Sequence, residues 1–115
     1  LSDTLEVNLT VDGALGTDTD VIPDEFVLHQ NYPNPFNPST DIKFSLPISE
    51  RVHLVVYDLL GNVVREMVNE DLNAGMYTYK WMGENQNGSK VSAGMYFYQI
   101  QAGSFIQTKK MILLK

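Results

Sequence analysis

The chain has 115 residues and no cysteine, which excludes disulfide scaffolds, thiolate metal sites and cysteine nucleophiles. Its formal net charge of −6 argues against nucleic acid as a partner, because binding phosphates needs a basic face. No apolar run approaches the roughly 20 residues of a membrane helix, so no membrane insertion is expected. The length fits one domain plus a tail. The first residue is Leu1 and no signal peptide is visible, so we expect a piece of a longer protein.

The first 25 residues differ in composition from the rest of the chain. Seven of the fourteen acidic residues lie within residues 1–40, which contain no lysine or arginine. The alternation of apolar and polar residues at 4–11 predicts a strand, either added to this domain or ending a preceding one. Residues 16–20 are small and polar, as is typical of a linker. We therefore interpret 1–25 as an acidic linker or the last strand of a preceding domain.

From residue 25 onward, short strand patterns follow one another. Residues 25–29 form a short strand candidate. Residues 40–46 alternate, which predicts that Ile42, Phe44 and Leu46 face the core while Ser45 points outward.

The next predicted strand covers residues 51–57, with Val52, Leu54 and Val56 inward and Val55 outward. Residues 58–62 are predicted to form a turn in which Gly61 supplies the left-handed conformation. Residues 63–68 return as the second arm of a hairpin, and 69–73 are predicted to be a polar loop.

The sequence Ala-Gly-Met-Tyr-x-Tyr occurs twice, at residues 74–79 and 93–98. In each copy a glycine permits a bend and two tyrosines then share one face of a strand. The second copy contains Gly94 and Tyr96, where a sandwich can form a tyrosine corner in which the hydroxyl bonds to upstream backbone. Residues 84–89 form a polar loop with an Asn-Gly turn signal, and 105–114 are the last predicted strand.

These patterns predict an all-β fold. Seven or eight short strands, turns about every ten residues and no sustained helical periodicity are typical of a β-sandwich or barrel.

Residues 31–40, here called the proline ribbon, carry three prolines that fix their own φ and push the preceding residues toward extended geometry. Tyr32 and Phe36 are the expected aromatic anchors of the ribbon. We interpret it as a brace that pins the start of the domain across the end or edge of the sandwich.

No catalytic or metal motif is visible, so neither an enzyme nor a cofactor is predicted. No Gly-x-Ser-x-Gly elbow or zinc-ligand spacing occurs, and His53 is expected on a solvated face. Asp18, Asp20, Asp24 and Glu25 cluster as calcium ligands can, but their spacing does not fit an EF-hand loop. Sugar binding would need exposed aromatic residues, and alternation favours burial of Tyr77, Tyr79 and Trp81.

The proline ribbon, together with the Ile-Lys-Phe-Ser-Leu-Pro run at 42–47, resembles the opening of the C-terminal sorting domain of the type IX (Por) secretion system. The likeness continues to the Lys-Lys-Met run at 109–111 and spans residues 26–115. The chain is also similar to the Ig-like domain of the flagellar hook-capping protein. It departs from the family at Met82 and Asn85, where aspartate is common. The family motif comprises Asn31, Tyr32, Pro33, Asn34, Pro35, Phe36, Asn37 and Pro38.

The resemblance implies an Ig-like antiparallel β-sandwich of about seven strands, carried by a larger exported protein of Bacteroidetes-type bacteria. It implies a non-catalytic secretion-targeting and surface-anchoring module. The implied partners are the type IX translocon and a sortase-like peptidase. The implied route crosses the periplasm and ends at the outer-membrane surface or outside the cell.

The last strand gives such a signal a physical basis. If it lies at a sheet edge, its unpaired backbone groups could be extended by a receptor strand, and the same edges could pair two copies of the chain. Equally, the strand could be a core strand with solvated lysines. The proposed signal strand consists of Lys109, Lys110, Met111, Ile112, Leu113, Leu114 and Lys115.

Two other functions remain open from the sequence. One is a structural Ig-like spacer or assembly domain, as the hook-capping relative suggests. The other is a carbohydrate-binding accessory module of a secreted enzyme.

Overall fold

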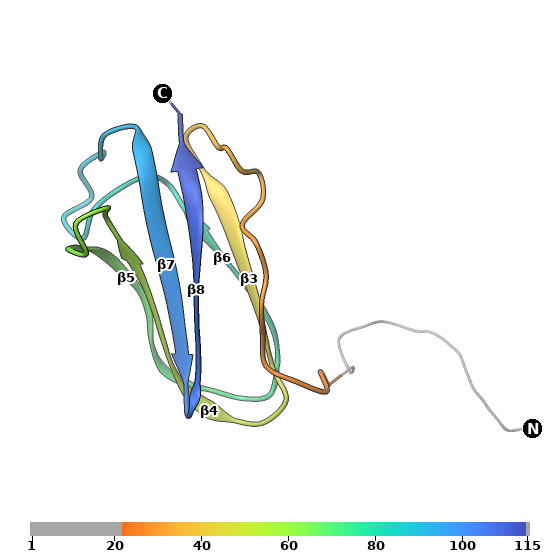
Figure 1. Cartoon of the computed structure of the whole chain (residues 1–115). Helices are drawn as coiled ribbons and strands as arrows, with labels where there is room; N and C mark the ends of the chain where they lie inside the picture. The colour runs from red at the N-terminus through yellow and green to blue at the C-terminus, as the bar shows by residue number, and fades with distance from the viewer. Residues whose placement is uncertain (1–21, 115) are drawn as a thin grey trace, which may run out of the picture.

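The structure, a computed structural model, describes residues 22–114, which form two antiparallel sheets packed as a sandwich (Figure 1). One sheet has the strand order β2-β3-β6 and the other β5-β4-β7-β8. No helix occurs in this range, so none could span a membrane. The predicted Ig-like β-sandwich is confirmed. The strands are β2 (Val27–Leu28), β3 (Thr40–Leu46), β4 (Glu50–Tyr57), β5 (Val63–Leu72), β6 (Gly75–Trp81), β7 (Gly94–Ala102) and β8 (Phe105–Leu113).

The core lies between the two sheets, as the alternation in the sequence predicts. The inward side chains of β3 and β4 are at most 1% exposed. The largest fully buried side chains are Trp81, Tyr98, Phe36 and Phe44. Burying large aromatic groups supplies much of the apolar area that stabilises so small a domain. The predicted strand at 4–11 lies outside the described residues, as does most of the predicted linker.

Two side chains that are predicted to point outward are nevertheless buried. Ser45 and Val55 are 6% and 3% exposed, although alternation places both on outer faces. Each lies on a strand with partners on both sides, since β3 pairs with β2 and β6 and β4 with β5 and β7. Neighbouring side chains on an inner strand therefore cover short side chains even on the outer face.

The predicted loop at 69–73 was also wrong, because β5 continues to Leu72. Leu72 lies opposite Glu50, and Asp71 lies opposite Arg51. The polar side chains of Asn69, Glu70 and Asp71 remain exposed there because β5 is an outer strand of its sheet, so the strand continues without burying them.

The hairpin turn between β4 and β5 has the predicted form, with Gly61 at φ 87°. The Asp58 carboxylate accepts hydrogen bonds from the backbone N–H of Leu60 and of Asn62, both at 2.9 Å. These bonds, led by the one from Asn62, lower the pKa of Asp58. The turn therefore holds its shape while the side chains of Leu59 and Leu60 stand in solvent, 65% and 88% exposed.

The chain between β2 and β3 changes sheets. β2 pairs antiparallel with β3, and farther along Phe36 forms a parallel bridge with Leu113 of β8. In Figure 1 this segment runs in orange beside β3 and reaches the end of the sandwich where β8 finishes. The segment thereby closes one side of the sandwich and brings the two predicted motifs together.

Candidate functional site

The proline ribbon and the end of β8 bind each other directly. The backbone N–H of Phe36 donates to the carbonyl of Ile112 at 3.0 Å, and the N–H of Leu114 donates to the carbonyl of Phe36 at 2.8 Å. The side-chain oxygen of Asn34 accepts from the N–H of Ile112 at 3.0 Å. The family motif and the proposed signal strand are thus one structural unit, although Ile112 follows Phe36 by 76 positions in the sequence.

This contact changes the expectation for the signal strand. β8 ends its sheet, so it is an edge strand in strand order. However, the outward backbone groups of Ile112 and Leu114 already bind the ribbon, and the carbonyl of Lys110 accepts from the side chain of Gln30 at 2.8 Å. A receptor strand could extend this part of β8 only by displacing the ribbon.

The side chains of the signal strand divide between core and surface. Met111 and Leu113 are 0% and 2% exposed, whereas Ile112 and Leu114 are 37% and 49% exposed. Lys110 is exposed and Lys109 is half-buried; Lys115 lies outside the described residues. Alternate residues of this strand therefore build the core and the surface, as in the interpretation of a core strand with solvated lysines.

Within the ribbon, only one of the two expected anchors is buried. Phe36 is 1% exposed and its ring lies 5.7 Å from that of Trp81, which in turn packs edge-on against Tyr96 at 5.3 Å. Tyr32 is 79% exposed and contributes its backbone instead, through mutual hydrogen bonds with Asp41 at 2.9 and 3.0 Å. The prediction that Tyr32 is an aromatic anchor was wrong.

The second anchor is Asn31, which sequence reasoning missed. Asn31 is 2% exposed, and its amide donates to the hydroxyl of Thr40 at 2.9 Å and to the carbonyl of Pro33 at 3.1 Å. Its backbone N–H donates to the Tyr98 hydroxyl at 2.7 Å, and that hydroxyl donates to the carbonyl of His29 at 2.6 Å. A buried polar group is tolerated because its hydrogen bonds are satisfied, and the bonds fix the ribbon in one position. The sequence places this asparagine in a polar, proline-rich segment, which does not reveal its burial.

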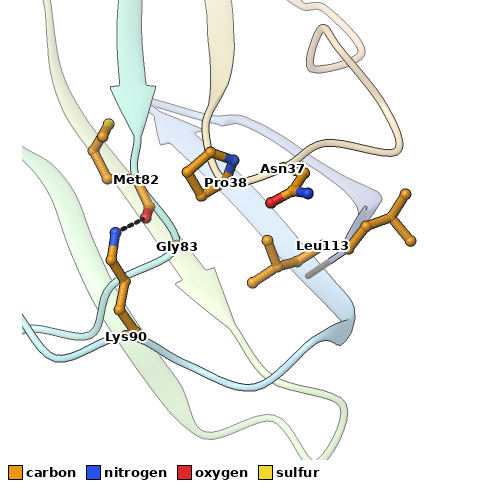
Figure 2. A pocket seen from close by; sticks show the side chains of 7 residues that line it. Asn37, Pro38, Met82, Gly83, Lys90 and Leu113 are labelled. Carbon is orange, nitrogen blue, oxygen red and sulfur yellow. Dashed lines mark hydrogen bonds between the residues drawn. The ribbon is translucent and has the colours of Figure 1, made fainter.

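A small apolar pocket lies where the ribbon, β8 and the segment after β6 meet (Figure 2). Its volume is about 210 Å³. Lys90 stands at this pocket, and its ammonium donates to the carbonyl of Met82 at 3.2 Å. The lining residues are Asn37, Pro38, Met82, Gly83, Lys90, Leu113 and Leu114.

The local sequence explains the shape of the pocket. Gly83 has φ +69°, and a Cβ atom there would lie 3.2 Å from the carbonyl oxygen of Pro38 and 3.4 Å from Leu113. Only glycine lets the backbone after β6 approach the ribbon and β8 this closely. Met82 contributes an apolar side chain to the wall of the pocket. The ammonium of Lys90 also lies 3.7 Å from the Glu84 carboxylate, so the pocket offers mainly apolar surface and could hold an apolar side chain.

The predicted tyrosine corner is present at the start of β7. Gly94 has φ +148°, and the Tyr96 hydroxyl donates to the carbonyl of Ser92 at 2.6 Å. Burial raises the pKa of Tyr96. This strand-start motif therefore stabilises the end of the sandwich at which the pocket lies, and we assign it a structural role.

The remaining candidates for chemistry lie apart from this end. His53 Nε2 is 2.6 Å from Glu66 Oε2, and both side chains are more than 40% exposed. No group of three or more residues able to hold a metal is found among residues 22–114. Asp18 and Asp20 lie outside that range, and Asp24 and Glu25 are exposed.

Three structures resemble this fold. Dimeric latent PorU from Porphyromonas gingivalis gives a TM-score of 0.63 at 20% identity, covering 83% of this chain and 10% of that chain. PorZ from Porphyromonas gingivalis, described as an essential bacterial surface component of the type IX secretion system, gives 0.52 at 15% identity, covering 87% of this chain and 13% of that one. FlgD from P. aeruginosa gives a TM-score of 0.52 at 22% identity, covering 76% of this chain and 68% of the FlgD chain.

At these identities the three structures establish the fold alone, and the chain spans only about a tenth of the length of PorU or PorZ. A search of curated proteins gave no match. The family model named FlgD Ig-like domain matches residues 37–104, which is more than half of the chain. Together with the sandwich and its tyrosine corner, this match shows that the chain belongs to the FlgD Ig-like domain family.

Proposed function

We propose that the chain is a non-catalytic secretion-targeting and surface-anchoring module of a larger exported protein, recognised by an outer-membrane translocon and a sortase-like peptidase. The observation that carries the proposal is the coupling of the ribbon to β8. Through Asn34 and Phe36, the motif that resembles sorting domains holds the last strand in a fixed position. A receptor would thus meet a preformed surface, which lowers the entropic cost of binding.

The recognised surface in this proposal is the end of the sandwich that carries the pocket. Leu114 and Met82 are 49% and 41% exposed beside it, and Ile112 is 37% exposed on the adjacent strand. Exposed apolar side chains around a pocket are typical of protein docking sites. Export to the cell surface is part of the same proposal. It is supported by the likeness of the fold to PorZ, itself described as a surface component of type IX secretion.

A structural spacer or assembly domain is the second candidate. Two observations support this candidate: the chain belongs to the FlgD Ig-like domain family, and its fold matches 68% of the FlgD chain. A carbohydrate-binding module has less support, because Trp81 is 1% exposed and its indole N–H is bound to the carbonyl of Glu84 at 2.9 Å. The side chain best suited to stack on a sugar therefore lies inside the sandwich.

A reporter fusion separates these functions. The full 115-residue chain would be joined to the C-terminus of a periplasmic reporter in a host competent for type IX secretion, and surface display would be measured. Removing residues 109–115 is expected to retain the reporter in the periplasm. Since this deletion also removes buried Met111 and Leu113, a variant that preserves the core is needed.

Leu114→Ser is that variant, because Leu114 lines the pocket and is half exposed. Leu60→Ser is the matched control, at an 88% exposed leucine that does not line the pocket. We expect Leu114→Ser to reduce surface display and Leu60→Ser to leave it unchanged. Loss of the domain from the mature surface protein, measured by mass, would support sorting. Retention of the domain, with display indifferent to Leu114→Ser, would favour the spacer.

A further inference from the structure

The two sheets have four outer edges, and within residues 22–114 three of them are short or partly covered. β2 is only two residues long, and the proline ribbon covers the C-terminal part of β8. The loop after β6 covers part of β5, where the carbonyl of Val64 accepts from the N–H of Gln86 at 2.9 Å and the N–H of Glu66 donates to the Gln86 side chain at 2.7 Å. Short strands, covering segments and charges are the usual ways to keep sheet edges from pairing with other chains.

The fourth edge runs along β6, and none of residues 22–114 covers it. On β3, the backbone groups of Asp41 and Lys43 point toward Tyr32 and His29, so the alternate residues of β3 bind β6. Asp41 and Lys43 lie opposite Lys80 and Thr78 in the register. The N–H and C=O groups of the even-numbered residues of β6 therefore point outward. Those residues are Met76, Thr78 and Lys80, and within residues 22–114 no hydrogen bond reaches their outward backbone groups.

The side chains along β6 also favour pairing. Met76 is 65% exposed on the outer face, and Tyr77 and Tyr79 are only half-buried on the inner face. Lys80 is the only charged residue of β6, and its ammonium lies 3.0 Å from the Asp41 carboxylate. A lysine neutralised in this way opposes the approach of another strand less than a free one would.

We propose that β6 pairs antiparallel with β6 of a second copy of this chain, with Thr78 on the two-fold axis, joining the two three-stranded sheets into one. In this register Thr78 faces the partner's Thr78, and Met76 faces the partner's Lys80. Each of these is a position whose backbone groups point outward, so all the outward N–H and C=O groups find partners.

The strand is complementary to itself, which a symmetric interface requires. Tyr77 lies opposite the partner's Tyr79 on the inner face, and aromatic cross-strand pairs of this kind stabilise sheets. No like charges lie opposite one another, because Lys80 meets a methionine. An unrelated partner strand would not need this symmetry. Because a single strand pair buries little area, the dimer is expected to be concentration-dependent.

The test uses the full 115-residue chain in sedimentation velocity over a range of concentrations. Thr78→Lys and Thr78→Glu each place like charges opposite themselves at the two-fold axis. Each is expected to weaken self-association by about fivefold. Mixing the two variants places lysine opposite glutamate and is expected to restore association to at least the wild-type level.

Thr108→Lys is the control, since Thr108 is an exposed threonine on β8, away from the proposed interface. It should leave association unchanged, and circular dichroism would confirm that each variant is folded. A wild-type chain that stays monomeric, a Thr78→Lys chain that associates normally, or a mixture that remains monomeric would overturn the proposal. So would a dimer weakened by Thr108→Lys instead.

Discussion

The two copies of Ala-Gly-Met-Tyr-x-Tyr begin β6 and β7, and they share their local geometry but not their surroundings. Gly75 and Gly94 have φ +154° and +148°. The Tyr77 hydroxyl donates to the carbonyl of Asn73 at 2.7 Å, as that of Tyr96 does to the carbonyl four residues upstream at 2.6 Å. The motif thus makes the same corner twice.

The two copies differ at the second tyrosine of the motif, which is Tyr79 in the first copy and Tyr98 in the second. Tyr98 is fully buried on a strand flanked by β4 and β8, and its hydroxyl binds the backbone of His29 and Asn31. Tyr79 is half-buried on an outer strand, where its ring stacks on Phe44 at 5.8 Å. The comparison teaches that the motif sets the bend, whereas the position of the strand in its sheet sets the burial.

The largest expected difference is between the alanine variants of these two tyrosines. Tyr98→Ala should lower the free energy of unfolding by roughly 3–5 kcal/mol, because it leaves a cavity in the core and frees the ribbon. Tyr79→Ala should cost about half as much, since part of its ring already contacts water. Urea denaturation of both variants measures the difference. Equal losses would contradict the assignment of Tyr98 to the core and Tyr79 to its margin.

Removing only the hydroxyl of Tyr98 should have a smaller effect. Tyr98→Phe keeps the ring but leaves the buried N–H of Asn31 without its partner, which should cost about 1–3 kcal/mol. Tyr79→Phe should change the free energy of unfolding by much less, because no hydrogen bond of its hydroxyl is seen among residues 22–114. Thermal unfolding of the pair tests this. A Tyr98→Phe variant as stable as the wild type would show that the hydroxyl of Tyr98 does not help to hold the ribbon in place.

The pH dependence of stability offers a related test. Burial raises the pKa of Tyr98 from 10.0 to about 12. The folded state therefore prefers the neutral phenol, and the stability that this group contributes is complete below pH 10 and is lost as the pH rises through 12. The wild type should accordingly lose stability over that interval, and Tyr98→Phe should show a shallower decline. Urea midpoints measured between pH 9 and 12 would reveal the difference, and parallel curves would refute the role of Tyr98.

How far the sequence predicts these features depends on the range of the contacts. Alternation identifies the core of β3 and β4, and Gly61 and Gly94 mark bends, because these signals are local. The contact of Phe36 with Ile112 has no local signal, since the two residues meet only after the sheets have formed. The burial of Asn31 was missed for the same reason, because its partners Thr40 and Tyr98 lie on different sheets. The core was therefore predictable, and the covered edge of β8 was not.

The two glycines should respond alike. Both have positive φ, where alanine is strained, so Gly75→Ala and Gly94→Ala should each cost about 1 kcal/mol or more. Added Cβ atoms would have room, since the nearest contact at Gly75 is 3.7 Å from Tyr77 and nothing lies within 4 Å at Gly94. Chemical denaturation would compare them. A large loss at one glycine alone would show that the two bends are not equivalent.

The smallest expected effect concerns the corner hydroxyls. Tyr77→Phe and Tyr96→Phe each remove one hydrogen bond to a backbone carbonyl, which should cost about 0.5–1.5 kcal/mol. Tyr96 should lie at the upper end of that range, because it is 7% exposed and packs on Trp81, whereas the bond of Tyr77 is open to water. Thermal unfolding of the two variants would measure the difference. If Tyr77→Phe were the more costly variant, burial would not be what distinguishes the two corners, and the chain between β5 and β6 would depend on its tyrosine more than its exposure indicates.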